Sequence, residues 1–438
     1  MVSFSIRRPF ATWGARLVVA ALFVSACGGS SGSTTNTASA PGITATQITI
    51  GSHQPLTGAA APGYSEISKA SDAYFQWVNA HGGVYGRTIK YMYEDDGYNP
   101  ATTSTVVHQL VLQDKVFAIF NGLGTPTHTA VVDYLNAQKV PDLFVASGCD
   151  CWNQPTKWPY TSGWQPDYII EGKVTGKYVN DTYSGMKVGY LYQDDDFGQG
   201  GVTGLDTQIP AASVVDKQKY VPTNINLGPQ LAHLQAAGAQ VVVLYTIPAF
   251  TALTLLTAAQ LHFNPKWVVS SVGADPTTLA GLVSTFSKGA AGASLLNGIV
   301  TSGYLPATGD TSSPWITLFK QIHDQYISSL PFDGNVIYGM AVGYSFVQLM
   351  TKAGRNPTRQ DVINTLQSGQ LDQGPGIVPL GYSSTSHLGY LGVQMATIQN
   401  GAAQFMGSIY TANSDPANAT VTACSNCASK PMPTNGIP

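Results

Sequence analysis

Short apolar runs alternate with amphipathic stretches along most of this chain from residue 43 onward. Residues 48–51 predict a strand, and residues 65–80 predict a helix because their apolar side chains recur at helical spacing. The alternation continues with strands predicted at residues 88–93, 116–120, 142–146, 187–192, 241–245 and 267–271, and with helices at residues 101–113, 127–138, 168–183, 229–237, 250–261, 336–352 and 359–368. Strands this apolar are typical of parallel sheets that helices cover on both faces.

The predicted strands outnumber those of a typical single sheet. We therefore expect an α/β fold of two Rossmann-like lobes with parallel sheets, and a cleft between the lobes. Near the C-terminus, residues 388–398 and 404–409 predict a hairpin that turns at Asn400–Gly401, a dipeptide typical of type I′ turns. Residues 413–438 are rich in Ser, Pro and Asn, and we expect them to form a polar tail.

The first residues carry the pattern of an export signal. Arg7, Arg8 and Arg16 are basic, residues 17–24 are apolar, and two small residues follow. An apolar run this short cannot cross a bilayer, which takes about 20 residues. We expect residues 1–26 to be a signal peptide that is removed. The Arg7–Arg8 pair leaves both the general secretory route and the twin-arginine route open.

The cysteine after this segment predicts a lipid anchor. Residues 24–27 (Val-Ser-Ala-Cys) resemble the lipobox of bacterial lipoproteins, in which the cysteine is acylated and becomes the mature N-terminus. Residues 27–42 would then form a lipidated flexible tether, since their Gly, Ser and Thr bury no apolar surface. The alternative is an ordinary cleavage site with a chance cysteine at Cys27. The lipoprotein hypothesis places the protein outside the cytoplasm, on the cell membrane.

Composition excludes two classes of protein. Hydrophobic residues make up 44% of the chain and charged residues only 10%, so we expect a large folded core. The formal charge is −3, and removal of the signal peptide takes away three arginines and no acidic residue, which leaves −6. We therefore expect no nucleic acid partner.

Four cysteines remain after Cys27, and an oxidising compartment favours disulfides. Their order along the chain is Cys149, Cys151, Cys424 and Cys427, which allows three connectivities that the sequence does not decide between. Four thiolates could instead bind zinc. The last two cysteines could alternatively form a redox pair, but they lack the flanking strand and helix of such a site.

The clearest candidate binding site is a glycine-rich turn between a strand and a helix. Gly122, Gly124, Thr125 and Thr127 follow the strand predicted at residues 116–120. Free N–H groups, the helix dipole and two hydroxyls there would suit a small anion such as a carboxylate. The spacing also approximates a dinucleotide fingerprint, but the third glycine and an acidic ribose partner are missing. A helix cap with no ligand is the simplest alternative.

Other predicted strands end in candidate contact residues. Ala146, Ser147 and Gly148 are small and would let a ligand approach the backbone. Ligands of open parallel sheets bind beyond the carboxyl ends of the strands. Strand ends of the second lobe would thus supply further candidates, which are Tyr192, Phe197, Tyr245 and Asp275.

Catalytic motifs are incomplete in this sequence. No G-x-S-x-G or H-E-x-x-H motif occurs, and residues 172–178 fall one residue short of a P-loop. Asp194, Asp195 and Asp196 lack EF-hand spacing, so we interpret them as a solvated acidic turn. We expect no enzyme activity, no cofactor and no metal.

Four motifs together resemble the leucine/isoleucine/valine-binding family, the extracytoplasmic solute-binding proteins of ABC importers. They are residues 94–100 (EDDGYNP), 121–125 (NGLGT), 191–198 (LYQDDDFG) and 338–344 (YGMAVGY). The resemblance covers residues 46–410. It implies a type I periplasmic-binding-protein fold with three hinge crossovers, near Trp164, Thr301 and Tyr382. The N-terminal lobe would comprise residues 43–164 and 302–382, and the C-terminal lobe residues 165–301 and 383–412.

The resemblance also implies roles for single residues. Thr125 and the backbone of Gly148 would grip a ligand carboxylate, and Asp275 would pair with an amino group. Phe197 stands where the family often has Tyr, and Tyr245 matches an aromatic wall of the site.

A small carboxylate such as a branched-chain amino acid is the expected ligand. The protein would be a monomer that delivers this ligand to a permease and ATPase complex. Asp150 and residues 273–276 depart from the family pattern. Residues 144–148, with Trp152, residues 158–159 and residues 163–166, resemble a branch some of whose members bind aromatic carboxylates. The alternatives are therefore a receptor for an aromatic carboxylate or amide, a sensory receptor and, last, an enzyme.

Overall fold

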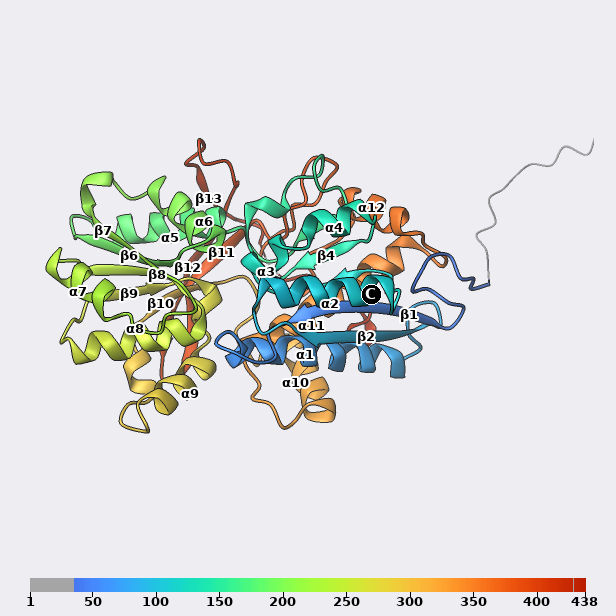
Figure 1. Ribbon diagram of the computed structural model, residues 1–438, viewed down its shortest axis with the longest axis horizontal. Coiled ribbons are helices and arrows are strands. Elements are labelled where there is room, and N and C mark those ends of the chain that lie inside the picture. Colours follow the sequence, from blue (N-terminus) through green and yellow to red (C-terminus); the bar gives the residue numbers. More distant parts are fainter. Residues whose placement is uncertain (1–34, 428) are drawn as a thin grey trace, which may run out of the picture. The chain divides into compact units, whose positions relative to one another are not determined.

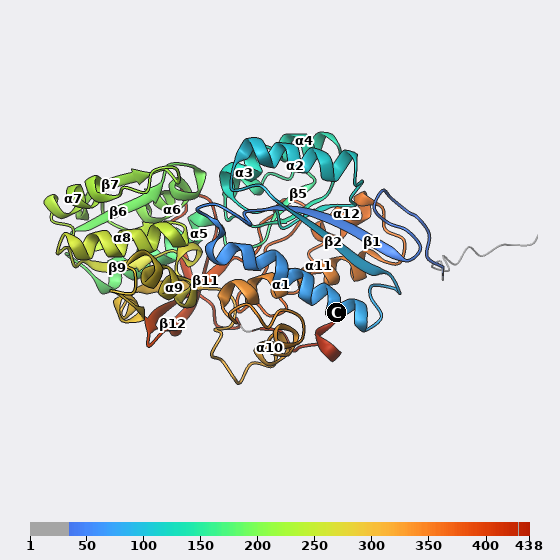
Figure 2. The same ribbon diagram turned by 60° about the horizontal axis from the view of Figure 1, so that its bottom comes forward.

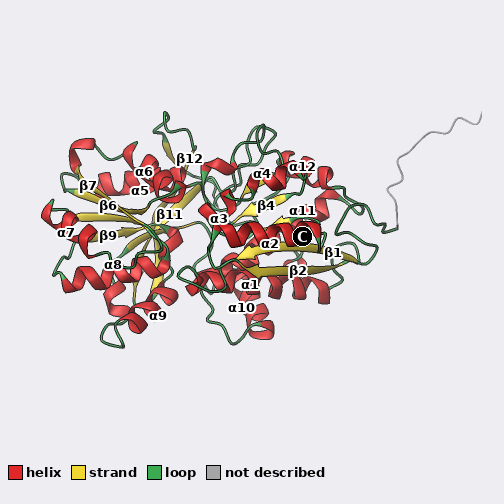
Figure 3. Cartoon of the chain, in the orientation of Figure 1, coloured by secondary structure: helices red, strands yellow, loops and turns green. Residues whose placement is uncertain are grey.

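The computed structural model describes residues 35–427 and 429–438. Two β-sheets, each packed against helices, form two α/β lobes (Figures 1 and 3). This arrangement confirms the predicted fold class. The signal peptide predicted at residues 1–26 and the lipidated Cys27 lie outside the described residues. Among the residues described, no helix is long and apolar enough to cross a membrane.

Lobe 1 contains a five-stranded parallel sheet in the order β2-β1-β3-β4-β5. Its strands are β1 (Gln47–Gln54), β2 (Thr88–Asp95), β3 (Ile119–Phe120), β4 (Asp142–Val145) and β5 (Thr161–Gly163). Its helices are α1 (Ala61–Ala80), α2 (Pro100–Leu112), α3 (Thr125–Thr129), α4 (Val132–Ala137), α10 (Pro314–Tyr326), α11 (Gly334–Ala353) and α12 (Arg359–Gln367). Helices α1 and α11 pack closely because Gly339 has no side chain to strike the carbonyl oxygen of Ile67.

Lobe 2 contains an eight-stranded sheet in the order β13-β12-β11-β10-β9-β8-β6-β7. The strands are β6 (Val188–Gln193), β7 (Val214–Tyr220), β8 (Val241–Tyr245), β9 (Lys266–Val269), β10 (Val300–Gly303), β11 (Gly392–Gln399), β12 (Ala402–Ala412) and β13 (Val421–Ala423). Its helices are α5 (Tyr168–Thr182), α6 (Asp196–Asp206), α7 (Gly228–Ala236), α8 (Pro248–Gln260) and α9 (Pro276–Phe286). The five strands from β6 to β10 are parallel, whereas β11, β12 and β13 are antiparallel.

The predicted hairpin is present as β11 and β12. Asn400 and Gly401 both have positive φ, at 52° and 78°. A type I′ turn requires positive φ at both central residues, which explains the Asn-Gly pair.

Between β5 and β11 the chain passes three times between the two lobes. It leaves lobe 1 after β5, returns after β10, and enters lobe 2 again before β11. Thr301 lies inside β10, so the second passage follows that residue. Tyr382 lies on the third passage, where its hydroxyl donates to the carbonyl oxygen of Gly163 at 2.6 Å.

Residues 413–438 do not form a free polar tail, which corrects that prediction. Strand β13 joins the sheet of lobe 2, and the chain then returns to lobe 1. The indole of Trp77 donates to Asn435, and the hydroxyl of Tyr74 donates to Gly436. Figure 2 shows this C-terminal end beside α1 and α10. These contacts could not be predicted from the polar composition, because the acceptors are backbone carbonyl groups and not side chains.

The flexible tether predicted at residues 27–42 is not free over its last residues, 35–42, which are the part that the structure describes. Within its described part, Asn36 donates to the backbone of Ala45 and Tyr85, and Ser39 donates to Pro357. Residues 35–42 are therefore held against lobe 1.

Both cysteine pairs are local disulfides, Cys149–Cys151 and Cys424–Cys427. This connectivity decides among the three alternatives and leaves none of these four thiols for zinc. No group of three metal-ligating side chains able to hold an ion occurs among the described residues.

Candidate ligand-binding site

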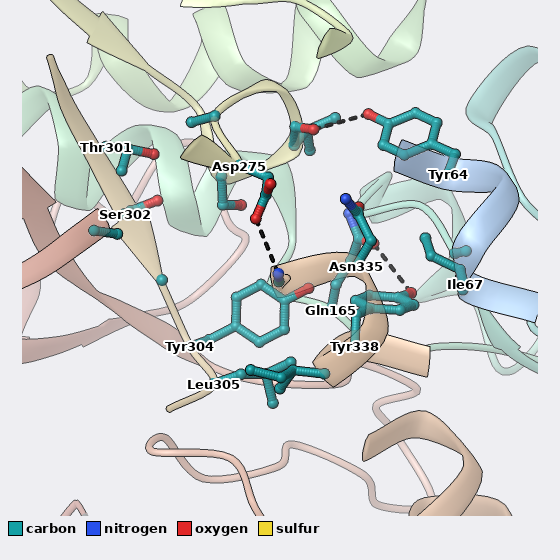
Figure 4. A pocket seen from close by; sticks show the side chains of 18 of the residues that line it. Tyr64, Ile67, Gln165, Asp275, Thr301, Ser302, Tyr304, Leu305, Asn335 and Tyr338 are labelled. Atoms are coloured by element: carbon teal, nitrogen blue, oxygen red, sulfur yellow. Dashed lines mark hydrogen bonds between the residues drawn. The ribbon is translucent and has the colours of Figure 1, made fainter. Parts of the chain in front are cut away.

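A cavity of about 200 Å³ lies between the lobes. Lobe 1 contributes α1, the turn after β3, and the start of α11. Lobe 2 contributes the starts of α5 and α9 and the end of β10. Figure 4 shows Asp275, Thr301 and Ser302 on one side of the cavity, and Tyr64, Ile67 and Asn335 on the other. The cavity thus lies at the carboxyl ends of the parallel strands, where α/β proteins bind ligands.

Direct hydrogen bonds join the lobes beside the cavity. The hydroxyl of Tyr64 donates to the carbonyl oxygen of Val272 at 2.8 Å. The backbone N–H of Gly334 donates to Oδ2 of Asp275 at 2.9 Å. Thr278 of lobe 2 accepts from the amide of Asn335 at 3.1 Å. These bonds hold the two lobes in contact beside the cavity.

Five of the predicted site residues line the cavity: Gly124, Thr125, Ala146, Phe197 and Asp275. They come from both lobes. The glycine at position 124 has a φ of 107°, and a side chain there would meet Tyr98 and Thr127. A residue without a side chain is therefore needed at this turn.

Ser147 and Gly148 lie behind the cavity and contact another side chain of the protein. The hydroxyls of Thr125 and Ser147 are 2.7 Å apart. A Cβ on Gly148 would lie 2.9 Å from two ring carbons of Tyr168, so the Tyr168 ring covers this glycine. Burial raises the pKa of Tyr168 to about 12, while hydrogen bonds with Gly148, Ser147 and Thr125 lower it. The groups predicted to bind an anion, on Thr125, Ser147 and Gly148, therefore lie next to the side chain of Tyr168.

Three predicted contacts do not line the cavity. The hydroxyl of Thr127 donates to the carbonyl oxygen of Leu123 at 2.6 Å, inside the turn. Tyr192 and Tyr245 are aligned on neighbouring strands, and their rings lie against Gly198 and Gly201 of α6. These two tyrosines were predicted to face the cleft, but glycines in α6 admit their rings beneath the helix.

The family follows from comparison with known proteins. The sequence profile of the family described as "Periplasmic binding protein" matches residues 47–403. The chain belongs to the periplasmic binding protein family. The predicted resemblance to leucine/isoleucine/valine-binding proteins is confirmed by relatives within this family.

One such relative is "Leu/Ile/Val-binding protein homolog 2" of Brucella abortus, which is 28% identical over 211 residues. That alignment covers 46% of this chain and 54% of the relative, so the chain matches about half of its length. A fatty acid ABC transporter substrate-binding protein from Thermomonospora curvata has a TM-score of 0.73 and 21% identity, covering 86% of this chain and 95% of that one. A branched-chain amino acid ABC transporter structure from Thermus thermophilus, with bound valine, has a TM-score of 0.72 and 18% identity, covering 84% and 97%.

Asp275 of this periplasmic binding protein belongs to a group of three carboxylates between the lobes. Its oxygens accept from Thr278 and Gly334, and burial and nearby Asp333 raise its pKa to about 6. Burial and the same Asp333 raise the pKa of Glu66 to about 8. Closure therefore brings acidic groups of both lobes together at the edge of the cavity.

Sequence patterns missed a buried acid that lies behind the cavity of this family member. Glu171 accepts from the hydroxyl of Ser302 and from the backbone N–H of Ser271, each at 2.6 Å. Both serines line the cavity, and Glu171 is 1% exposed. Its pKa is raised by burial. The sequence of α5 does not mark Glu171 as a site residue, because its hydrogen-bond partners come from other elements.

Tyr168, Tyr304 and Tyr338 also line the cavity and were not predicted as contacts. Tyr338 begins one of the family motifs, and that position was the available signal. Its hydroxyl donates to Gln165 at 3.3 Å and accepts from Asn121 at 3.2 Å. Tyr304 lies on the second passage between the lobes, where no sequence pattern marks a contact.

Four buried side chains beneath the glycine-rich turn form a chain of hydrogen bonds that was not predicted from the sequence. Nδ1 of His53 is 2.8 Å from Asp96, and Nε2 of His53 is 2.9 Å from Nδ1 of His128. Nε2 of His128 is 2.7 Å from Asp142. A Cβ on Gly122 would strike both imidazole rings. The chain of hydrogen bonds thus fixes the floor on which the turn rests.

Proposed function

We propose that this protein is the extracytoplasmic receptor of an ABC importer. It closes its two lobes over a small solute, releases that solute unchanged to a permease and ATPase complex, and is held at the membrane by a lipid on Cys27. The observation that carries this proposal is a cavity lined from both lobes, beside direct interlobe hydrogen bonds. Contacts to both lobes exist only after closure, so a solute that makes them shifts the population toward the closed form.

The lining of the cavity indicates a solute with a mainly apolar body. Ile67, Leu123, Ile247, Leu305 and Phe405 all line it. A volume of about 200 Å³ is small for a ligand pocket and suits a molecule of the size of a branched-chain amino acid. The names of related structures support this class, since one was solved with bound valine and another serves a fatty acid transporter.

Filling the cavity tests this proposal. Ala403 lines the cavity and is half-buried, whereas Ala417 is exposed on the lobe 2 surface. Ala403→Trp should abolish the rise in unfolding temperature that a bound solute produces, and Ala417→Trp should leave that rise unchanged. An unaffected response in Ala403→Trp would show that the solute binds elsewhere. Recovery of a chemically altered solute would identify an enzyme instead of a receptor.

A further inference from the structure

We propose that the phenol ring of Tyr168 covers the anion position of this site, so that the solute carries no carboxylate. The proposal rests on the receptor function above and narrows its solute class to apolar molecules with an uncharged polar group, such as an amide or an alcohol. The donors that the sequence offers to an anion, on Thr125, Ser147 and Gly148, converge on one place. That place holds a phenol of the same chain.

The backbone holds Tyr168 over these donors. The N–H of Tyr168 donates to the carbonyl oxygen of Gly148 at 2.6 Å, so the first residue of α5 is bonded to the loop after β4. The ring then lies 2.9 Å from where a Cβ of Gly148 would be. A side chain here would strike the ring and, nearer still, the backbone oxygen of Pro166. The pairing of a bare glycine with this tyrosine explains how the ring lies directly over the backbone of Gly148.

Packing from the other side keeps the ring in place. The centroid of Phe197 lies 4.8 Å from that of Tyr168. A Cβ on Gly200 would lie 3.1 Å from the Cβ of Tyr168, so α6 approaches closely. Tyr168 is only 4% exposed. Thr125 lines the cavity, but a ligand carboxylate could reach Ser147 and Gly148 behind it only by pushing the ring out of this contact, at the cost of the packing on Phe197.

The charges around the cavity also disfavour an anion. No Lys, Arg or His is among the described residues that line it. The charged side chain in the lining is Asp275, with Glu66 and Asp333 beside it, and Glu171 lies under Ser302. A carboxylate would lose its water in this medium of low dielectric with no cation in return.

One hydroxyl is left for an uncharged group. Thr301 is 3% exposed and lines the cavity, and its Oγ1 has no hydrogen-bond partner among the described residues. A buried hydroxyl without a partner is costly, and a carbonyl or hydroxyl of a solute would satisfy it. The Thr301 hydroxyl lies on β10, away from the Thr125 turn. It could form a hydrogen bond with an uncharged polar group of the solute.

Acid and amide pairs of equal shape test the proposal. We would measure binding of isovalerate against isovaleramide, and of phenylacetate against phenylacetamide, by calorimetry on the full mature chain. Wild-type protein should bind neither acid, and any amide it binds should be favoured by about tenfold or more, because an unpaired charge costs more than one factor of ten. Tyr168→Gly should gain binding of at least one acid, since the three donors are then free. Tyr168→Phe keeps the ring and should exclude the acids like the wild type.

Each result decides the question. Wild-type protein that binds either acid as tightly as its amide overturns the proposal, and so does a folded Tyr168→Gly protein that binds neither acid. Tyr168→Ala replaces the glycine variant if that one fails to fold, which circular dichroism would show. Acid binding by the wild type would leave the receptor function intact, whereas the receptor function fails if bound solute never draws the lobes together.

Discussion

The hydroxyl of Tyr64 on α1 donates to the carbonyl oxygen of Val272 at 2.8 Å, and this bond joins the two lobes above the cavity. Both residues line the cavity, so the bond and the solute share one wall. It forms only when the lobes meet. The closed form is therefore stabilised by groups that the solute itself does not supply.

Tyr64→Phe should weaken solute binding by about fivefold, because one net hydrogen bond of about 1 kcal/mol is lost from the closed form alone. Calorimetry with any solute that raises the unfolding temperature of the wild type measures this. Tyr85→Phe is the matched control, since its hydroxyl donates to Thr351 within lobe 1. Equal losses in both variants would show that the effect does not come from the interlobe bond.

The carboxylates of Glu66 and Asp275 should make the closed form depend on pH. Their pKa values are raised to about 8 and about 6, by burial first and by Asp333 next, while Lys69 acts in the opposite direction on Glu66. A raised carboxylate pKa favours the protonated form of the folded state. That contribution to stability is complete at low pH and is lost as pH rises through these values.

We therefore expect the unfolding midpoint in denaturant to fall between pH 5 and pH 8.5, with solute affinity following it. Glu66→Gln cannot ionise and should flatten the upper part of this dependence. The exposed Asp181, bonded to Lys177 within α5, provides the control Asp181→Asn, which should keep the slope of the wild type. A wild-type slope unchanged in Glu66→Gln would contradict this account of the three carboxylates.

The His53–His128 contact should matter for stability as well as for the site. His128→Phe leaves Asp142 and Nε2 of His53 short of a buried partner, which should lower the free energy of unfolding by about 3 kcal/mol. Chemical denaturation measures this, with the exposed His233→Phe as the control. A loss below about 0.5 kcal/mol, the usual size for surface substitutions, would mean that the polar chain contributes little to the turn above it.

Local patterns predicted much of the fold. Apolar runs marked most strands of both sheets, and Asn400–Gly401 marked the hairpin, because burial and turn geometry are properties of short segments. The edge strand β7 was missed, since it is partly exposed and three of its seven residues, Asp216, Lys217 and Lys219, are charged. The helix expected at residues 127–138 is divided into α3 and α4, a break that the hydrophobic periodicity did not indicate.

The site was predicted only in part, for a reason of geometry. Strand ends such as Thr125 and Asp275 lie at the cleft because parallel strands share one direction, and that rule works from sequence. The rule does not say which way a side chain turns, so Tyr245 was expected in the cleft and lies under α6. Tyr168 reaches Gly148 through the first passage between the lobes, a relation that no local pattern encodes.

The most direct test of the central claim is small-angle X-ray scattering of the mature protein with and without saturating solute. If the cavity between the lobes is the binding site, the radius of gyration should fall on saturation, and Tyr64→Phe should need more solute to reach the same value. A radius of gyration that stays constant while calorimetry shows the site to be full would contradict binding by closure.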